Sequence, residues 1–334
     1  MTRRRTTRIY RGTVHNLARL ASRLQAGDLV AVPTETVYGL AANALDARAC
    51  ARIFTAKSRP RTDPLIVHLH DVGQLPDVAV PNPTAMRLAR AFWPGPLTLI
   101  LPKTADVPDV VTAGGDSVAV RIPAHPLFRR LLARCRLPLA APSANPFGYV
   151  SPTTAAHVRE GLAGKIGYIL DGGPARIGLE STIIDARDPQ RLRVLRPGAI
   201  TATQIRRVAG RPVRDFESAA ASPSQAQVAP GQLLQHYSPR ARVILHDRLP
   251  AVTQLPSADN GVAWLYFGRP AGATRHPIHW LSAKGDQTEA AHALFAKLRD
   301  LDRRHCQVIH AELAPLGSLA LAINDRLRRA AAGA

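Results

Sequence analysis

The chain has 334 residues, of which 46% are hydrophobic, and its formal net charge is +20. This apolar content is ample for packed cores, and a chain of this length is expected to form two domains. No stretch approaches the roughly 18 uninterrupted apolar residues that a membrane span needs, and no apolar segment follows the basic start of the chain. We therefore expect a soluble protein that is not exported.

The positive charge favours an anionic partner such as RNA or a nucleotide. A compositional bias explains the charge equally well, because only five of the 44 basic residues are lysine. Both explanations stay open at this point. The three cysteines, Cys50, Cys135 and Cys306, lie far apart and outside any Cys-x-x-Cys pair. They predict neither a disulfide framework nor a zinc site, and they suit a reducing cytoplasm.

The expected elements alternate along the first two thirds of the chain, after a basic arm at residues 1–12. Apolar residues between Val14 and Leu24 fall on one helical face, and the run 29–32 has the character of a buried strand. Further helices are expected at 46–57, 84–92, 125–135, 153–162 and 201–209, and strands at 65–69, 97–101, 117–122, 138–141, 167–170, 182–185 and 192–196. This mixture predicts an α/β or α+β domain at 13–212.

From Asp215 to Pro230 the sequence turns to Ser, Ala, Gln and Pro without periodicity, which is typical of an exposed connection. We place a linker at 213–239. Beyond it, the expected strands are 242–246, 262–267 and 307–310, and the expected helices are 286–302 and 316–331. These elements predict a second, smaller α/β domain at 240–334.

Three common fingerprints are absent from the sequence: the phosphate-binding P-loop, the dinucleotide-binding Gly-x-Gly-x-x-Gly and the Gly-x-Ser-x-Gly nucleophile elbow. Ordinary kinase and hydrolase functions are therefore disfavoured. Polar clusters lie instead at the ends of expected strands, where open α/β sheets usually hold ligands.

The most informative cluster supplies hydroxyls, two cations and an imidazole within a short strand, helix and strand. Its members are Thr34, Thr36, Lys57, Arg59 and His68. Such a set suits a phosphate and a carboxylate together. The alternative for Lys57 and Arg59 is that they complement the dipole of the helix they follow.

Other polar residues follow further strands. Arg121 is embedded in a strand, where it is costly without an anionic partner, so it binds either a ligand or a buried acidic side chain. Ser143 and Asn145 lie in a proline-framed turn. They either present a hydroxyl and an amide to a ligand or serve only to form a simple turn. Glycines between Asp171 and Thr182 allow a backbone to approach phosphate closely, and Arg196 ends another strand.

Seven short segments of the chain together resemble the YrdC-like family over about residues 30–200. They are PTETVYGL at 33–40, AKSRP at 56–60, PLIVH at 64–68, FWPGPLT at 92–98, AAPSAN at 140–145, EST at 180–182 and LRPG at 195–198. Pro230-Gly231 and the segment His236-Tyr237-Ser238-Pro239, followed by a second domain, are similar to the long, two-domain members of the family. The expected fold is a twisted open mixed sheet with flanking helices, plus a smaller Rossmann-like domain.

The resemblance implies a nucleotidyltransferase that converts L-threonine, bicarbonate and ATP to threonylcarbamoyl-AMP and pyrophosphate. This product is the activated intermediate for threonylcarbamoyladenosine next to the anticodon of tRNA, so a threonylcarbamoyl transferase complex is an implied partner. Mg²⁺ is expected with ATP, and no prosthetic group is expected. A hard cation held by phosphate and water leaves no ligand motif, so no metal ligand is named.

The resemblance also implies a role for each matching residue. Lys57 and Arg59 are the expected catalytic cations. His236 and Tyr237 are expected to form a lid over the cleft. The residues expected around threonine are Thr36, His68, Arg121, Ser143 and Ser181. Those expected around ATP are Lys57, Arg59, Asp63, Ser117, Asn145, Ser151, Arg196 and Tyr237.

The chain departs from the family pattern at Ser58, where glycine is usual, at Asp63, where asparagine is common, and around Ser117. A carboxylate at 63 would repel phosphate unless it pairs with Arg59, Arg61 or Mg²⁺. Two other functions stay open. One is a non-catalytic protein that binds double-stranded RNA or regulates. The other is carbamoyl transfer in hydrogenase maturation, although this chain lacks the zinc-binding cysteine pairs and the acylphosphatase module of those proteins.

Overall fold

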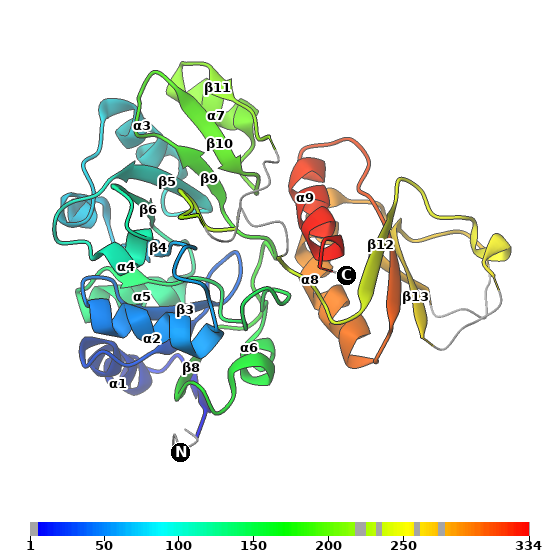
Figure 1. Cartoon of the computed structure of the whole chain (residues 1–334), viewed down its shortest axis with the longest axis horizontal. Coiled ribbons are helices and arrows are strands. Elements are labelled where there is room, and N and C mark those ends of the chain that lie inside the picture. The colour runs from blue at the N-terminus through cyan, green and yellow to red at the C-terminus, as the bar shows by residue number, and fades with distance from the viewer. Residues whose placement is uncertain (1–5, 218–224, 232–235, 257–260, 273–277, 334) are drawn as a thin grey trace. The chain divides into compact units, whose positions relative to one another are not determined.

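The computed structural model describes residues 6–217, 225–231, 236–256, 261–272 and 278–333. By its contacts the chain divides into two units (Figure 1). The first unit comprises Met1–Phe147, Pro152–Arg176 and Glu180–Leu233, and the second comprises Gly148–Ser151, Ile177–Leu179 and Leu234–Ala334. The division differs from the expected boundaries, because two short segments from within 13–212 make their contacts in the second unit.

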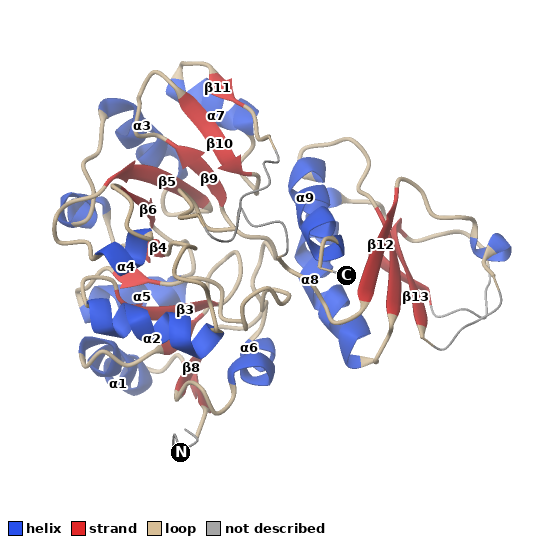
Figure 2. Cartoon of the chain, in the orientation of Figure 1, coloured by secondary structure: helices blue, strands red, loops and turns tan. Residues whose placement is uncertain are grey.

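A large mixed sheet forms the centre of the first unit, with helices on its flanks (Figure 2). Its described strands run in the order β1-β8-β2-β3-β7-β4-β6-β5-β9-β10-β11. They are β1 (Arg8–Arg11), β2 (Val30–Val32), β3 (Gly39–Asn43), β4 (Ile66–His68), β5 (Leu97–Pro102), β6 (Ser117–Arg121), β7 (Leu139–Ala140), β8 (Tyr168–Asp171), β9 (Thr182–Asp185), β10 (Leu192–Arg196) and β11 (Val213–Arg214). The helices are α1 (Val14–Gln25), α2 (Ala47–Lys57), α3 (Pro83–Phe92), α4 (Asp109–Thr112), α5 (Pro126–Cys135), α6 (Ala155–Leu162) and α7 (Ala202–Ala209), with a 3-10 helix η1 (Val72–Asp77).

Local sequence signals fix several helix ends. The side chain of Thr13 accepts a hydrogen bond from the amide of Asn16 at the start of α1, and Thr201 and Gln204 form a reciprocal capping box at α7. Helix α2 ends at Lys57, and Ser58 takes the left-handed conformation with φ 55°. The family's usual glycine at this position is explained by that conformation, which glycine adopts without strain.

The apolar runs predicted the buried strands and helices, but some elements were missed. Residues Arg8–Arg11 of the expected basic arm form β1, which pairs in parallel with β8. Strand β3 was missed because Gly39–Asn43 lacks the β-branched and aromatic residues typical of strands. Strand β11, at the start of the expected linker, has only two residues and pairs with β10.

The second unit contains a four-stranded parallel sheet in the order β12-β15-β13-β14. Its strands are β12 (Arg242–His246), β13 (Val262–Gly268), β14 (Ile278–Ser282) and β15 (Val308–Glu312), and its helices are α8 (Gln287–Arg303) and α9 (Ala320–Ala331), with a 3-10 helix η2 (Val252–Gln254). The expected α/β, Rossmann-like character of this domain is confirmed, although β14 was not predicted. Within the described ranges, no helix has the length and apolar character needed to span a membrane.

Candidate active site

The site begins at the ends of two neighbouring strands of the large sheet. Strands β4 and β6 are parallel, and their register pairs His68 with Arg121 at their last residues. Parallel neighbours end at the same edge, so both side chains lie together on one face. NH1 of Arg121 donates a hydrogen bond to Oγ1 of Thr36 at 3.1 Å. The structure therefore brings three residues of the expected threonine set into one cluster.

A fourth member, Glu35, was not named as a site residue from the sequence. Its Oε1 lies 3.0 Å from NH2 of Arg121, and its Oε2 accepts a hydrogen bond from the amide of Ala124 at 3.0 Å. The buried ion pair considered as an alternative for Arg121 is therefore present. The sequence could have pointed to Glu35 as this partner, because a strand-embedded arginine needs an acidic side chain and Glu35 lies between Thr34 and Thr36.

Burial keeps the imidazole of His68 uncharged. Burial and, to a lesser degree, the neighbouring Arg121 guanidinium lower the pKa of His68 to about 3. Its Nδ1 lies 3.2 Å from the carbonyl of Ile66, and its ring packs 5.5 Å from that of Phe128. At neutral pH this side chain is a hydrogen-bonding group and not a cation.

Lys57 holds the turn that carries Ser143 and Asn145. The lysine is 1% exposed, and its Nζ donates to the backbone carbonyls of Ser143 and, at 2.6 Å, of Asn145. Burial lowers the pKa of Lys57 well below its usual range, Arg59 lowers it further, and Asp63 partly opposes both. The two hydrogen bonds of Lys57 make the Lys-Ser-Arg and Ser-Ala-Asn segments neighbours, and a single antiparallel bridge between Ser143 and Gly39 brings the 33–40 segment beside them.

Arg59 forms an ion pair with Asp63. A carboxylate at this position departs from the family pattern and would repel phosphate if it were unpaired. NH2 of Arg59 lies 3.0 Å from Oδ2 of Asp63, while its Nε and NH2 donate to the carbonyls of Asp63 and Pro64 at 3.0 and 2.7 Å. Burial raises the pKa of Asp63, and Arg59 and Lys57 oppose that rise. The ion pair reduces the repulsion that an isolated carboxylate would exert on phosphate.

Ser181 and Arg196 connect the expected threonine and ATP sets. Oγ of Ser181 lies 2.7 Å from Oγ1 of Thr98, and NH2 of Arg196 donates to the same Oγ at 3.0 Å. The Nε of Arg196 donates to the carbonyl of Ser181 at 3.0 Å. Nearby Gly198 admits no side chain, because a Cβ there would lie 2.5 Å from the amide nitrogen of Thr182.

A buried apolar cluster on the sheet, called the apolar floor below, includes residues two positions before His68 and Arg121 on their strands. Its members are Ile66, Ile100, Ala119, Ile183, Leu195 and Ala229. Ala229 comes from the expected linker, and the amide of nearby Gln227 donates to the carbonyl of Thr62 at 2.9 Å. Ser117 lies on the same strand face as Arg121, but four residues of strand place their Cα atoms about 13 Å apart. Ser117 is therefore not part of the Arg121 cluster.

The remaining expected site residues belong to the second unit. Tyr237 is buried, with its ring stacked 5.4 Å from Phe295 and the guanidinium of Arg326 at 5.5 Å. The ring of His236 lies 4.1 Å from that of Tyr237, and the carbonyl of Ser151 accepts from Nε of Arg299 at 3.3 Å. Residues 218–224 and 232–235 of the expected lid lie outside the described residues.

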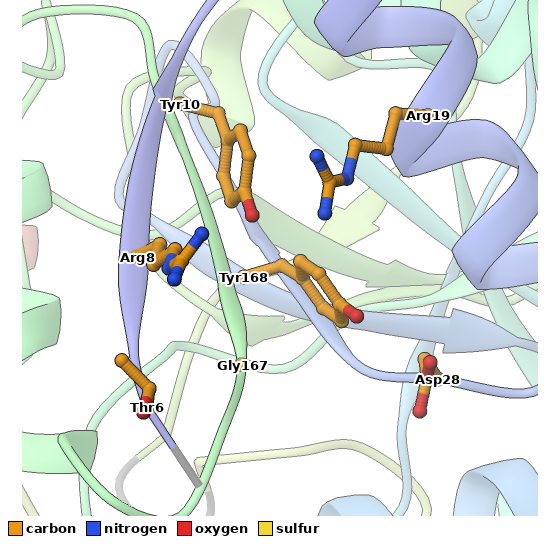
Figure 3. Close-up of a pocket in the computed structure, with 7 residues that line it drawn as sticks. All are labelled: Thr6, Arg8, Tyr10, Arg19, Asp28, Gly167 and Tyr168. Carbon is orange, nitrogen blue, oxygen red and sulfur yellow. The ribbon is translucent and has the colours of Figure 1, made fainter.

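A separate cleft of about 430 Å³ lies at the β1 edge of the large sheet. Figure 3 shows Tyr10 and Tyr168 facing it with Arg8 and Arg19 beside them. The two tyrosine rings are 5.9 Å apart, and the Arg19 guanidinium lies 5.6 Å from the ring of Tyr10. Asp28, which also lines the cleft, pairs with Arg52 at 2.9 Å. The cleft therefore combines aromatic faces with cations.

Comparison with known proteins gives one family match for each of two consecutive parts of the chain. Residues 22–198 match the family model Sua5/YciO/YrdC, described as telomere recombination. Residues 200–332 match the threonylcarbamoyl-AMP synthase C-terminal domain. The chain is 42% identical to the threonylcarbamoyl-AMP synthase of Pyrococcus abyssi over 92% of this chain and 91% of the relative. It is 39% identical to that of Bacillus subtilis, over 95% and 93%.

Two solved structures of Sua5 are similar to this chain over nearly its whole length. The crystal structure of Pyrococcus abyssi Sua5 complexed with L-threonine superposes with a TM-score of 0.85 at 38% identity, covering 97% of each chain. A variant of Sua5 from the same organism, in which a histidine and the next residue, a tyrosine, are replaced by alanine, gives a TM-score of 0.86 at 36% identity over 98% of this chain and 97% of that one.

Proposed function

The chain belongs to the Sua5/YciO/YrdC family, and on that premise we propose that it is a threonylcarbamoyl-AMP synthase. The substrates are L-threonine, bicarbonate and ATP, and the products are threonylcarbamoyl-AMP and pyrophosphate. The observation that carries the proposal is the buried cluster of Thr36, His68 and Arg121 at the ends of β4 and β6. A similar chain is known in complex with L-threonine.

Arg121 binds the carboxylate of threonine in this proposal. A guanidinium is suited to a carboxylate, since its planar fork donates two parallel hydrogen bonds. Thr36, Ser143 and Ser181 supply hydroxyl groups, and neutral His68 supplies a further polar contact without adding charge. The close contact of Ser181 with Arg196 supports adjacent threonine and ATP sites.

Lys57, Arg59 and Arg196 face the triphosphate, together with Asn145. The amine of threonine first forms a carbamate from bicarbonate with loss of water. A carbamate oxygen then attacks the α-phosphorus of ATP, the bond to the bridging oxygen breaks, and pyrophosphate leaves with that electron pair. The cations neutralise the charge that develops on the phosphates, so positioning and electrostatics carry the catalysis. Ser117, Asp63 and Ser151 stay proposed ATP contacts.

Mg²⁺ belongs to this proposal as part of the MgATP substrate. A resident metal site does not fit the part of the chain that the structure describes, which holds no group of three or more His, Cys, Asp or Glu side chains placed for a metal ion. The carboxylate in the cluster of cations, Asp63, is paired with Arg59. Magnesium bound by phosphate and water needs few protein ligands.

The linker at 213–239 closes over the site as a lid, with Tyr237 reaching ATP. Ala229 supports this role, because it packs on the apolar floor beside the proposed substrate sites. A lid would exclude the water that hydrolyses an activated intermediate. The product passes to a threonylcarbamoyl transferase complex acting on tRNA, and the cleft at Tyr10 and Tyr168 is the proposed RNA contact. A cytoplasmic location suits three free cysteines.

The decisive experiment incubates the protein with MgATP, L-threonine and labelled bicarbonate and follows labelled threonylcarbamoyl-AMP and pyrophosphate by rapid chromatography. We expect product that requires all three substrates. Lys57→Ala and Arg121→Ala should nearly abolish it, whereas Arg191→Ala, at an exposed arginine, serves as a matched control. Wild-type turnover in either site variant would refute the assignment. RNA binding by a protein that makes no product would favour the non-catalytic alternative.

A further inference from the structure

In the ion pair between Glu35 and Arg121, polar atoms of both side chains are still able to form further hydrogen bonds. Oε1 of Glu35 and NH2 of Arg121 are 3.0 Å apart. Among the described residues, however, neither atom has an aligned hydrogen-bond partner, and neither does Nε of Arg121. Both residues are 3% exposed. Buried polar atoms in proteins are nearly always hydrogen-bonded, so an unsatisfied acceptor beside unsatisfied donors requires an explanation.

The rest of each side chain is fixed by the protein. Oε2 of Glu35 accepts from the amide of Ala124 at 3.0 Å, and NH1 of Arg121 donates to Thr36 at 3.1 Å. Thr36 is itself held, because its hydroxyl lies 2.7 Å from that of Thr34. The unsatisfied atoms therefore belong to a pre-organised frame, in which the groups that bind a ligand are already oriented before it arrives.

We propose that Glu35 receives the α-ammonium group of the amino-acid substrate while Arg121 receives its α-carboxylate. The inference rests on the proposed function, in which Arg121 binds threonine. An acceptor and donors about 3 Å apart match a zwitterion, whose two charged groups are attached to one carbon. The charges also balance, because the ion pair and the zwitterion are each neutral and no further counter-ion is needed in a buried site.

The test measures binding of two ligands to the full-length chain by calorimetry. One is L-threonine, and the other is the 2,3-dihydroxybutyrate of the same configuration, in which a hydroxyl replaces the ammonium group. We expect the wild type to bind threonine on the order of 10- to 100-fold more tightly, as for a charge-assisted hydrogen bond. Glu35→Gln retains an oxygen for the Ala124 amide but loses the charge. It should weaken threonine binding by a similar factor and discriminate little between the two ligands.

Glu160→Gln, at an exposed position on α6, makes the same chemical change away from the site and should bind both ligands as the wild type does. Two results overturn the inference. One is equal weakening of both ligands by Glu35→Gln, which would mean that Glu35 acts only through Arg121. The other is equal affinity of the wild type for both ligands, a measurement that stands even if the variant fails to fold. A wild type that binds no threonine and makes no product would instead contradict the proposed function itself.

Discussion

At the scale of single residues, Ser58 carries a conformational cost and His68 an electrostatic one. Ser58 has a positive φ of 55° at the end of α2, and buried His68 has a pKa of about 3. Both lie in the segments that build the site. Local strain and burial of this kind are common where a fold positions functional groups, and they predict how stability responds to substitution and to pH.

Ser58→Gly should stabilise the fold by about 1 kcal/mol, because a left-handed conformation costs an L-residue roughly that amount. Ser58 is exposed, so its side chain contributes no packing that the substitution would remove. Urea unfolding of the wild type, Ser58→Gly and Ser58→Ala measures the effect. The alanine variant is the control, since it shortens the side chain without relieving the backbone. A glycine variant less stable than the wild type would contradict the argument.

The pKa of His68 predicts a loss of stability in mild acid. The unfolded imidazole takes up a proton near pH 6.5, whereas the folded one does so only near pH 3. The unfolded state therefore binds more protons between these values, and stability falls as pH falls below about 6.5. From pH 6.5 to 5 the loss is about 2 kcal/mol. Chemical denaturation across this range should give a flatter curve for His68→Gln, and parallel curves would refute the prediction.

At the scale of elements, strand register assembles the candidate site and α8 binds an irregular segment. Arg299 of α8 donates to the carbonyl of Val150 at 2.6 Å and to that of Ser151 at 3.3 Å. Its guanidinium also lies 4.8 Å from the ring of Tyr149, whose hydroxyl donates to Asp302 at 2.6 Å. One helix therefore binds two backbone carbonyls and the Tyr149 hydroxyl of the segment Gly148–Ser151.

Arg299→Ala should destabilise the second unit by about 3 kcal/mol, because it removes donors from two buried carbonyls. The residue is 1% exposed. Thermal unfolding followed through the tryptophans of the second unit, Trp264 and Trp280, reports the change. Arg303→Ala, at an exposed position on the same helix, is the matched control and should change little. An equal effect of the two substitutions would show that the contacts to Val150 and Ser151 contribute no stability.

At the scale of the whole molecule, the features to test are the linker between the two units and the positive charge that lines the cleft. The linker joins two units but also places Ala229 on the apolar floor of the first. The net charge of +20 is spread over a chain in which Arg8 and Arg19 line a cleft with two tyrosines. Replacing the linker should leave product yield unchanged if it is only a tether, and should lower the yield if it is a lid. RNA affinity should depend on Arg8 and Arg19 if the cleft is a specific contact, and only on total charge if it is not.

Replacing residues 215–231 by a Gly-Ser linker of equal length keeps the reach between the units. If the segment closes the site, product yield should fall on the order of tenfold or more, because water reaches the intermediate. The chromatographic assay for threonylcarbamoyl-AMP measures the yield, with unfolding curves to confirm that both units are intact. Unchanged yield would contradict the lid.

Substituting both Arg8 and Arg19 with alanine should weaken binding of unmodified tRNA. The slope of log affinity against log salt should become shallower by about 1 for each phosphate that the protein no longer neutralises. Fluorescence anisotropy at several salt concentrations gives both quantities. A double variant of Arg191 and Arg207, two exposed arginines elsewhere on the first unit, removes the same charge. If both double variants weaken binding equally, the cleft is not a specific RNA-binding surface.

The sequence alone determined most helices and strands, the α/β class and the family, and it supplied the polar residues that are proposed for the site. These follow from local periodicity and from short motifs in which each residue type has a chemical role. Only the tertiary structure decided that β1 and β3 are strands, that Glu35 pairs with Arg121, and that Ser181 contacts Arg196. Such contacts depend on the order and register of strands, which pair through backbone groups common to every residue and therefore leave little trace in local sequence.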